Sequence, residues 1–284
     1  MSLGSSPGSR AAGVLGKPIG HSLSPVLHRA AYQALGLNWS YSAVECDEDG
    51  LADLLARSGP ELVGYSCTMP LKRQALRLAA TASPMATAIG AANTLLAGPN
   101  GWTADNTDWI GIRDALPAGA LPAGGSVVLL GAGGTAQAAL AALAALSRPG
   151  PAAEIVALVR EPSRAGELLA AADRIGVAVS IGGLAEASRI GAADLVIATL
   201  PAGAADSLAT AVDWRVGQVL LEAIYRPWPT PLAQAAARAG AQVVSGARML
   251  LLQAAGQVQL MTGRAAPTEA MRAALLAAVP DCGG

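Results

Sequence analysis

Charged residues are scarce in this sequence, and no stretch of it is strongly basic. Only 14% of the 284 residues are Asp, Glu, Lys or Arg, and the formal net charge is −1. Nucleic acids and acidic membrane surfaces attract proteins through basic clusters, so neither has anything here to bind electrostatically. Hydrophobic residues make up 52% of the chain, yet no uninterrupted apolar run reaches membrane-spanning length. These absences favour a soluble enzyme with a small-molecule substrate, no nucleic-acid partner and no membrane partner.

Cysteine and histidine are also rare. The three cysteines, Cys46, Cys67 and Cys282, are odd in number and lack the spacing of a metal site. They argue against a disulfide framework and against zinc, and they favour a reducing compartment, which we expect to be the cytoplasm. The two histidines, His21 and His28, have no further ligand in a suitable pattern, so the sequence predicts no metal site.

A glycine-rich turn is the most informative stretch. The apolar run Val127–Leu130 leads into Gly131, Gly133 and Ala136, which have G-x-G-x-x-A spacing. In such turns the first glycine permits a tight bend, the second lets backbone N–H groups approach a pyrophosphate, and the small third residue lets helix and strand pack closely. An ordinary strand-to-helix turn is the alternative. The helical run Thr135–Leu146 and the strand before it favour a dinucleotide site.

Strand and helix patterns alternate along the whole chain, which is long enough for two domains. After residue 126, six apolar runs separated by helical segments predict a complete doubly wound sheet. These runs are Val127–Leu130, Ile155–Val159, Val177–Ile181, Leu195–Ala198, Val219–Leu221 and Val243–Val244. Earlier runs at Ala12–Leu15, Trp39–Cys46 and Glu61–Cys67 predict parallel βαβ units, and Gly98–Gly101 is typical of a hairpin turn.

Proline marks the starts of several predicted helices. Ser24 is expected to cap a helix that begins at Pro25, and Ser83 with Pro84 repeats this pattern. Pro70 begins another predicted helix, which carries Lys72 in its first turn. Two more helices are expected at 249–261 and 267–279.

Seven segments carry a further signal when they are taken together. They are Gly16–His28, Gly64–Lys72, Ala92–Thr94, Asp105–Asp108, the turn at Gly131, Tyr225 with Pro227 and Thr230–Pro231, and Gly246–Gln253. In this order and at these distances they resemble the shikimate dehydrogenase family, from about residue 13 to about residue 275.

The resemblance implies an enzyme that uses NADP to reduce 3-dehydroshikimate reversibly to shikimate, in the chorismate pathway of aromatic amino acid biosynthesis. It implies an α/β substrate domain at residues 11–108, completed by C-terminal helices at 249–280. Residues 109–248 would form a Rossmann domain with a doubly wound parallel sheet for NADP. A homodimer is compatible with this interpretation.

The resemblance also assigns roles to individual residues. Lys72 and Asp108 would form the catalytic pair, and Ser22 with Ser24 would hold the substrate carboxylate. The remaining substrate contacts would be Thr68, Asn93, Tyr225 and Gln253. The cofactor contacts would be Gly131, Ala132, Gly133, Gly134, Thr135, Arg160, Arg164, Thr199, Ala223, Gly246 and Met249.

Ketone reduction needs such a catalytic pair for reasons independent of the family. Hydride transfer to a ketone develops negative charge on the oxygen, which must then gain a proton. Lys72 can supply it, and a carboxylate beside the lysine can orient it. Asp105 and Asp108 could both be turn or cap residues, but motif position favours Asp108 as the catalytic one. Ser24 has a second interpretation as a helix cap alone.

Some positions depart from the usual family pattern. Ser66 stands where asparagine is usual beside the substrate. Arg160 follows the second strand of the nucleotide domain, where a guanidinium can bind a 2′-phosphate and favour NADP. Glu161 would repel that phosphate. If Pro162 turns Glu161 outward, Arg160 and Arg164 face the phosphate alone.

Two other functions are compatible with the pattern. One is a quinate or quinate/shikimate dehydrogenase that uses NAD, although Ser22 and Ser24 favour shikimate. The other is a nucleotide-binding regulatory protein without catalysis. The presence of Lys72, Asn93 and Asp108 argues against it.

Overall fold

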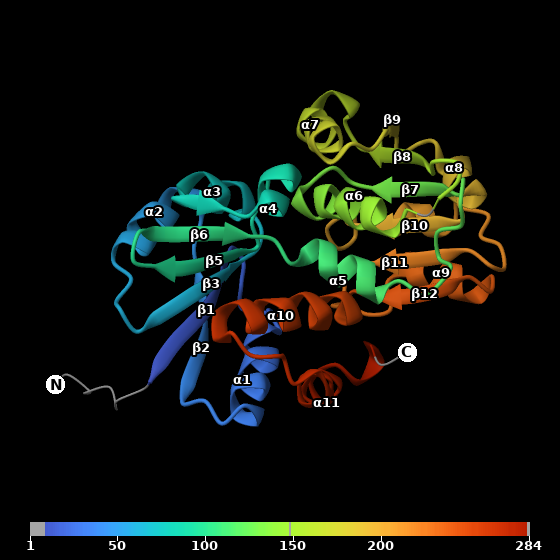
Figure 1. The fold of residues 1–284 in the computed structure, drawn as a ribbon. Coiled ribbons are helices and arrows are strands. Elements are labelled where there is room, and N and C mark those ends of the chain that lie inside the picture. Colours follow the sequence, from blue (N-terminus) through green and yellow to red (C-terminus); the bar gives the residue numbers. More distant parts are fainter. Residues whose placement is uncertain (1–8, 148, 283–284) are drawn as a thin grey trace. The chain divides into compact units, whose positions relative to one another are not determined.

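The computed structural model describes residues 9–147 and 149–282, and the chain divides into two compact units. The first unit contains the described residues up to Thr107 together with Gln253–Ala278. The second contains Asp108–Leu252 and the short segment after Ala278. Each unit has a six-stranded sheet flanked by helices (Figure 1). The predicted α/β class with a doubly wound parallel sheet is confirmed.

The first unit has a mixed sheet in the order β2-β1-β3-β5-β6-β4. Its elements are β1 (Arg10–Gly16), α1 (Ser24–Ala34), β2 (Trp39–Glu45), α2 (Glu48–Ala56), β3 (Leu62–Cys67), α3 (Lys72–Leu78), β4 (Thr81–Ala82), α4 (Pro84–Ile89), β5 (Thr94–Gly98), β6 (Gly101–Asp105) and α11 (Thr268–Ala278). The later part of α10 (Gly246–Thr262) also belongs to this unit.

The parallel arrangement expected for this half holds for part of the sheet. Strand β1 pairs in parallel with β2 and β3, whereas β5 is antiparallel to both β3 and β6. The predicted hairpin turn explains the β5–β6 pair. It joins β5 directly to β6 through Pro99 and Asn100, and so short a connection can link only antiparallel neighbours.

The predicted cap at Ser24 is wrong. Helix α1 begins at Ser24, its N-cap is Leu23, and no side chain makes a capping hydrogen bond. The Oγ of Ser22 instead accepts a hydrogen bond from the Ser24 backbone N–H at 3.3 Å. The cap at Ser83 is confirmed, because its hydroxyl oxygen accepts from the Ala86 N–H at 3.1 Å.

The second unit has an all-parallel sheet in the order β12-β11-β10-β7-β8-β9. Its elements are α5 (Asp108–Ala115), β7 (Ser126–Leu130), α6 (Gly134–Leu146), β8 (Glu154–Val159), α7 (Gly166–Ile175), β9 (Ser180–Gly183), α8 (Ala187–Ala192), β10 (Leu195–Ala198), β11 (Val219–Glu222), α9 (Pro231–Arg238) and β12 (Gln242–Ser245), followed by the start of α10. The strand order reverses beside β7, and ligands of doubly wound sheets bind at such a switch point.

One predicted strand of this sheet is displaced along the chain. The expected run Val177–Ile181 is replaced by β9, because α7 ends at a left-handed Gly176 and the Val177 N–H bonds back to Ala172 O at 3.0 Å. That capping arrangement uses the first residues of the run. Strand β9 then pairs with β8, with Ser180 opposite Val156.

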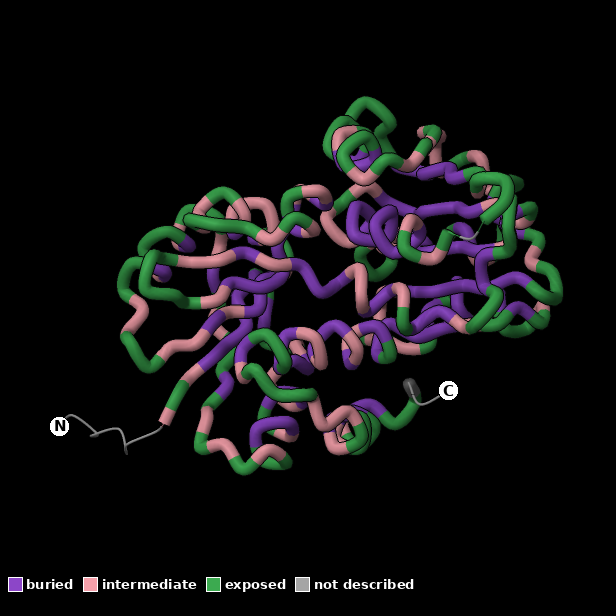
Figure 2. The backbone as a smooth tube through the Cα atoms, in the orientation of Figure 1, coloured by how far each residue is buried: buried purple, intermediate pink, exposed green. Residues whose placement is uncertain are grey.

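Buried strands form the centre of each unit, as the purple segments in Figure 2 show. In the second unit, Val127–Leu130 of β7 and all of β10 are buried, and α6 packs with a face of buried alanines. Small side chains let that helix lie close to the sheet. Among the described residues, no helix combines the length and the apolar character needed to cross a membrane.

Candidate active site

In the first unit, the ends of β1 and β3 meet the start of β5. The Thr68 N–H bonds to Leu15 O at 2.9 Å, and the Cys67 N–H bonds to Asn93 O at 2.7 Å. A side chain at Gly16 would stand 2.5 Å from the Thr68 methyl group, so only glycine lets these two segments approach so closely. The predicted residues Thr68 and Asn93 therefore lie at one edge of this sheet.

Lys72 lies at the same edge. It is the first residue of α3, and its carbonyl accepts a hydrogen bond from the Ala92 N–H at 2.8 Å. Its side chain is half-buried. The backbone thus holds the predicted catalytic lysine next to the segment that ends in Asn93.

Asn93 and Gln253 form a buried amide cluster with Thr107. The Nδ2 group of Asn93 donates to Thr107 Oγ1 at 2.9 Å and to Gln253 Oε1 at 3.1 Å. Its Oδ1 accepts from the Thr107 N–H and from the Thr94 hydroxyl, both at 2.8 Å. Residues far apart in the sequence are therefore brought together by the fold, and both predicted amides belong to one network.

The two acidic residues of the Asp105–Asp108 motif differ in their surroundings. Asp105 Oδ1 accepts from the Ser83 hydroxyl and from the Asn106 N–H, both at 2.7 Å. These bonds hold the turn after β6. Asp108 is the first residue of α5 and is 5% exposed. The structural use of Asp105 supports the prediction that Asp108 is the catalytic carboxylate.

The predicted carboxylate-binding loop precedes α1. Ser22 is half-buried and its N–H bonds to Ile19 O at 2.9 Å, whereas Ser24 is 5% exposed. Loss of the capping role removes one of the two interpretations of Ser24. Its proposed contact with the substrate stays a prediction.

In the second unit, the glycine-rich turn lies between β7 and α6. Gly131 has φ +108°, and a side chain there would stand 2.8 Å from Thr199 Oγ1. Among the described residues, apart from Gly133 and its two chain neighbours, no atom lies within 4 Å of the place where a side chain at Gly133 would stand. Gly133 is also the N-cap of α6 and makes no side-chain cap bond. A helix N-terminus that has no side-chain cap and has open space beside it fits a pyrophosphate.

The remaining predicted cofactor residues lie on neighbouring segments of this unit. Thr199 follows β10 and donates from its hydroxyl to Leu130 O at 2.9 Å. Gly246 begins α10 directly against the carbonyl groups of Ala223 and Ile224, where no side chain would fit. Ala132, Gly134, Thr135 and Ala223 are partly buried, and Met249 is 7% exposed. The predicted substrate residue Tyr225 is also partly buried and lies in this unit, after β11.

In the loop after β8, Glu161 pairs with Arg164. Its carboxylate lies 3.6 Å from the Arg164 guanidinium, and both side chains are exposed. The positive charge of Arg164 is therefore opposed by Glu161. Arg160 is also exposed, and it stays the first candidate in this loop to bind a 2′-phosphate.

Two buried residues near these segments were missed from the sequence. Gln257 lies four residues after Gln253 on α10, and a second glutamine on the same helical face was the signal that could have indicated it. Glu222 ends β11 and accepts a hydrogen bond from the Thr230 hydroxyl at 3.2 Å. Burial raises the pKa of Glu222 to about 7.

His28 is part of the buried core of the first unit. It is fully buried, stacks on Tyr41 with ring centroids 4.0 Å apart, and lies 3.3 Å from Gln257 Oε1. Burial lowers the pKa of His28 to about 3, so the ring is neutral. Among the described residues, no three of the His, Cys, Asp and Glu side chains gather as metal ligands would.

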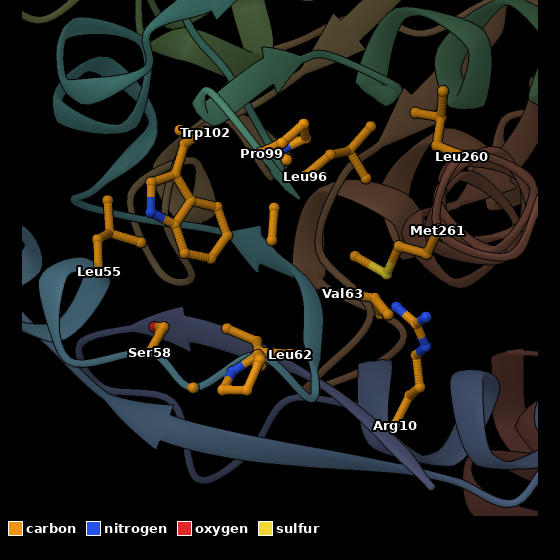
Figure 3. Close-up of a pocket in the computed structure, with 15 residues that line it drawn as sticks. Arg10, Leu55, Ser58, Leu62, Val63, Leu96, Pro99, Trp102, Leu260 and Met261 are labelled. Atoms are coloured by element: carbon orange, nitrogen blue, oxygen red, sulfur yellow. The ribbon is translucent and has the colours of Figure 1, made fainter. Parts of the chain in front are cut away.

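A groove of about 770 Å³ in the first unit lies away from these residues. Figure 3 shows its walls, which include Leu62 and Val63 at the start of β3, Leu96 near the end of β5, and Trp102. Thr68, which follows β3, and Asn93, which precedes β5, lie at the opposite ends of these two strands. The groove is therefore separate from the candidate active site.

Comparison with known proteins identifies the family. The family model described as the shikimate dehydrogenase substrate binding domain matches residues 14–95, and that described as the shikimate 5′-dehydrogenase C-terminal domain matches residues 246–276. A protein of Methanosarcina acetivorans named shikimate dehydrogenase (NADP(+)) is 38% identical over 95% of this chain and 99% of its own length. This chain belongs to the shikimate dehydrogenase family.

Solved structures of shikimate dehydrogenases agree. That of the Mycobacterium tuberculosis enzyme has a TM-score of 0.83 and 45% identity, covering 95% of this chain and 99% of the other. The shikimate 5-dehydrogenase of Thermus thermophilus, solved in complex with NADP(H) and shikimate, has a TM-score of 0.79 and 30% identity, with the same coverage.

Proposed function

We propose that this chain catalyses the reversible, NADP-dependent reduction of 3-dehydroshikimate to shikimate. The observation that carries the proposal is the likeness, over 95% of the chain, to a shikimate 5-dehydrogenase whose structure holds both NADP(H) and shikimate. The curated relatives named for NADP favour this cofactor over the NAD-linked quinate alternative. The reaction belongs to the pathway that makes chorismate and the aromatic amino acids.

The two parts of the chain would divide the work. Residues 11–108 with the helices at 249–280 would bind the substrate, and residues 109–248 would bind NADP. The amide cluster at the edge of the first sheet and the N-terminus of α6, which has no side-chain cap, support this division. NADPH, when bound, supplies the hydride.

Lys72 would then complete the reduction. As the carbonyl carbon gains the hydride, its oxygen becomes negative, and the Lys72 ammonium donates a proton to that oxygen. In the oxidative direction the neutral amine takes the hydroxyl proton back. Asp108 would orient the lysine and accept a hydrogen bond from a neighbouring hydroxyl. The burial of Asp108 supports a positioned carboxylate.

The remaining polar residues would orient the substrate. The hydroxyls of Ser22 and Ser24 would donate to its carboxylate, and Thr68, Asn93 and Gln253 would contact its hydroxyls. Tyr225 is the other residue proposed to contact the substrate. In the second unit, the turn Gly131–Thr135 would bind the pyrophosphate.

Replacement of Lys72 tests the catalytic assignment. Lys72→Ala should lower kcat for shikimate oxidation by about 10²–10⁴-fold, the usual contribution of a positioned acid–base group. The double variant with Asp108→Asn should lose little more than the worse single variant, because the two act as one unit. Lys17→Ala is the matched control, since Lys17 is half-exposed and pairs with Asp47 at 3.0 Å. A Lys72→Ala variant with the kcat of the control would refute the assignment.

A further inference from the structure

A buried series of hydrogen bonds runs through the first unit and ends at Asn93, one of the predicted substrate residues. The Tyr41 hydroxyl donates to Ser66 Oγ at 2.6 Å, and the Ser66 hydroxyl donates to Gln257 Oε1 at 2.8 Å. The Nε2 group of Gln257 donates to Thr94 Oγ1 at 3.1 Å. The Thr94 hydroxyl donates to Asn93 Oδ1 at 2.8 Å. These five side chains are each at most 4% exposed.

The donor-to-acceptor direction of these hydrogen bonds is fixed at Gln257. Gln257 Nε2 also donates to the backbone carbonyl of Asn93 at 2.9 Å, and a carbonyl can only accept. The amide must therefore turn its NH₂ group toward β5 and its oxygen toward Ser66 and His28. A flipped amide would place two oxygens against each other and leave buried donors unpaired.

The same logic fixes the Asn93 amide. Because the Thr94 hydroxyl accepts from Gln257, its own hydrogen is directed to Asn93 Oδ1. The Thr107 N–H, which can only donate, bonds to the same oxygen. The Nδ2 group of Asn93 must then face Gln253 Oε1, so the Nε2 branch of Gln253 is the one turned away from Asn93.

Gln257 and Gln253 are also linked through α10. Residues four apart lie on one face of a helix, so the bonds of Gln257 to β3 and β5 hold Gln253 beside Asn93. Ser66 belongs to the same hydrogen-bond network. It occupies the position where asparagine is usual in the family, and here its hydroxyl is engaged by Tyr41 and Gln257.

From these contacts we infer that Gln257 is a positioning residue that sets the amide direction of Asn93 and holds Gln253 for the substrate. Gln257 does not touch the substrate itself. The expected change in KM rests on the proposed function. The amide geometry does not depend on that function.

The kinetic test is Gln257→Glu, with Gln259→Glu as the matched control on an exposed part of the same helix. An ionised carboxylate at position 257 would repel the Asn93 carbonyl, whereas a protonated carboxyl could still donate to it. The KM for shikimate should therefore rise about tenfold or more as the pH increases, while the KM for NADP stays unchanged. Of the described titratable side chains, His28 contacts Gln257 directly, and Tyr41 is linked to it through Ser66. Burial lowers the pKa of His28 to about 3 and raises the pKa of Tyr41 above its usual value, so neither changes charge near neutral pH.

A second measurement does not depend on turnover. The side-chain amide hydrogens of Asn93 should exchange slowly with solvent in the wild-type protein and at least tenfold faster in Gln257→Met. They should stay slow in Gln259→Met. Slow exchange in Gln257→Met, or a rise in the KM for NADP equal to that for shikimate, would overturn the inference. A wild-type protein that does not oxidise shikimate would overturn the proposed function, and the exchange rates would then decide the positioning role by themselves.

Discussion

Gln137 is a fully buried polar side chain in α6 whose amide nitrogen and oxygen have no hydrogen-bond partner among the described residues. Such a group loses its bonds to water on folding and regains none. Gln137→Met keeps the length of the side chain and removes the polar atoms. It should raise the free energy of unfolding by about 1–2 kcal/mol, measured by urea denaturation.

The exposed glutamine of α1 provides a control for this change. Gln33→Met should alter the free energy of unfolding by less than about 0.5 kcal/mol, as surface substitutions usually do. A Gln137→Met variant less stable than the wild type would show that the amide is stabilising where it lies.

Sequence motifs could indicate which residues matter at this scale, but the contacts of a side chain depend on the fold. Nothing in the pattern around Ser24 shows that Leu23 would be the N-cap, because the difference lies in one backbone conformation. The network around Gln257 joins residues that are up to 229 positions apart. Its donors and acceptors can be paired only when the sheet and α10 are in place. The roles given to Lys72 and Asp108 stay predictions.

At the scale of elements, Glu222 connects the end of β11 to the start of α9. Its carboxylate accepts from Thr230, the residue that caps α9, and from the Ile224 N–H. Burial is the main cause that raises the pKa of Glu222 from 4.5 to about 7, and the charge of Asp206 adds to it. The folded state therefore binds this proton more tightly than the unfolded chain does.

The raised pKa of Glu222 makes the stability of the fold depend on pH. The folded state retains the proton between about pH 4.5 and pH 7, so the free energy of unfolding should fall as the pH rises through that window. Above pH 7 the decrease in the free energy of unfolding should approach about 3 kcal/mol. Each tenfold difference in proton affinity between the folded and unfolded states contributes about 1.4 kcal/mol. Glu222→Gln keeps both accepted bonds and should abolish this part of the pH dependence. Parallel denaturation curves for the two proteins at pH 5 and pH 8 provide the measurement, and an identical pH dependence would contradict the burial argument.

The elements themselves could largely be predicted from hydrophobic periodicity and proline positions. Six strands after residue 126 follow from apolar runs, and α4 follows from Ser83 and Pro84. The hairpin turn at Gly98–Gly101 predicts that β5 and β6 are antiparallel. The antiparallel pairing of β5 with β3 could not be predicted, because alternation of strands and helices alone favours a parallel pair. The displacement of β9 results from a left-handed glycine, and a sequence pattern does not specify whether such a glycine ends the helix.

For the whole molecule, the cofactor preference depends on the loop after β8. Arg160→Ala should raise the KM for NADP by about 10–100-fold and change the KM for NAD little, because a charge-assisted hydrogen bond to the 2′-phosphate contributes about 1.5–3 kcal/mol. Arg164→Ala is the comparison within the same loop. Its effect should be smaller, since the Arg164 guanidinium already lies 3.6 Å from Glu161. Equal effects of Arg160→Ala on both cofactors would contradict this role.

The most direct test of the whole account is the initial rate at which the purified wild-type chain forms reduced nicotinamide. Shikimate and quinate should each be supplied with NADP and with NAD, and the four values of kcat/KM compared. The highest value is expected for shikimate with NADP. No turnover of that pair, or a higher value for quinate with NAD, would contradict it.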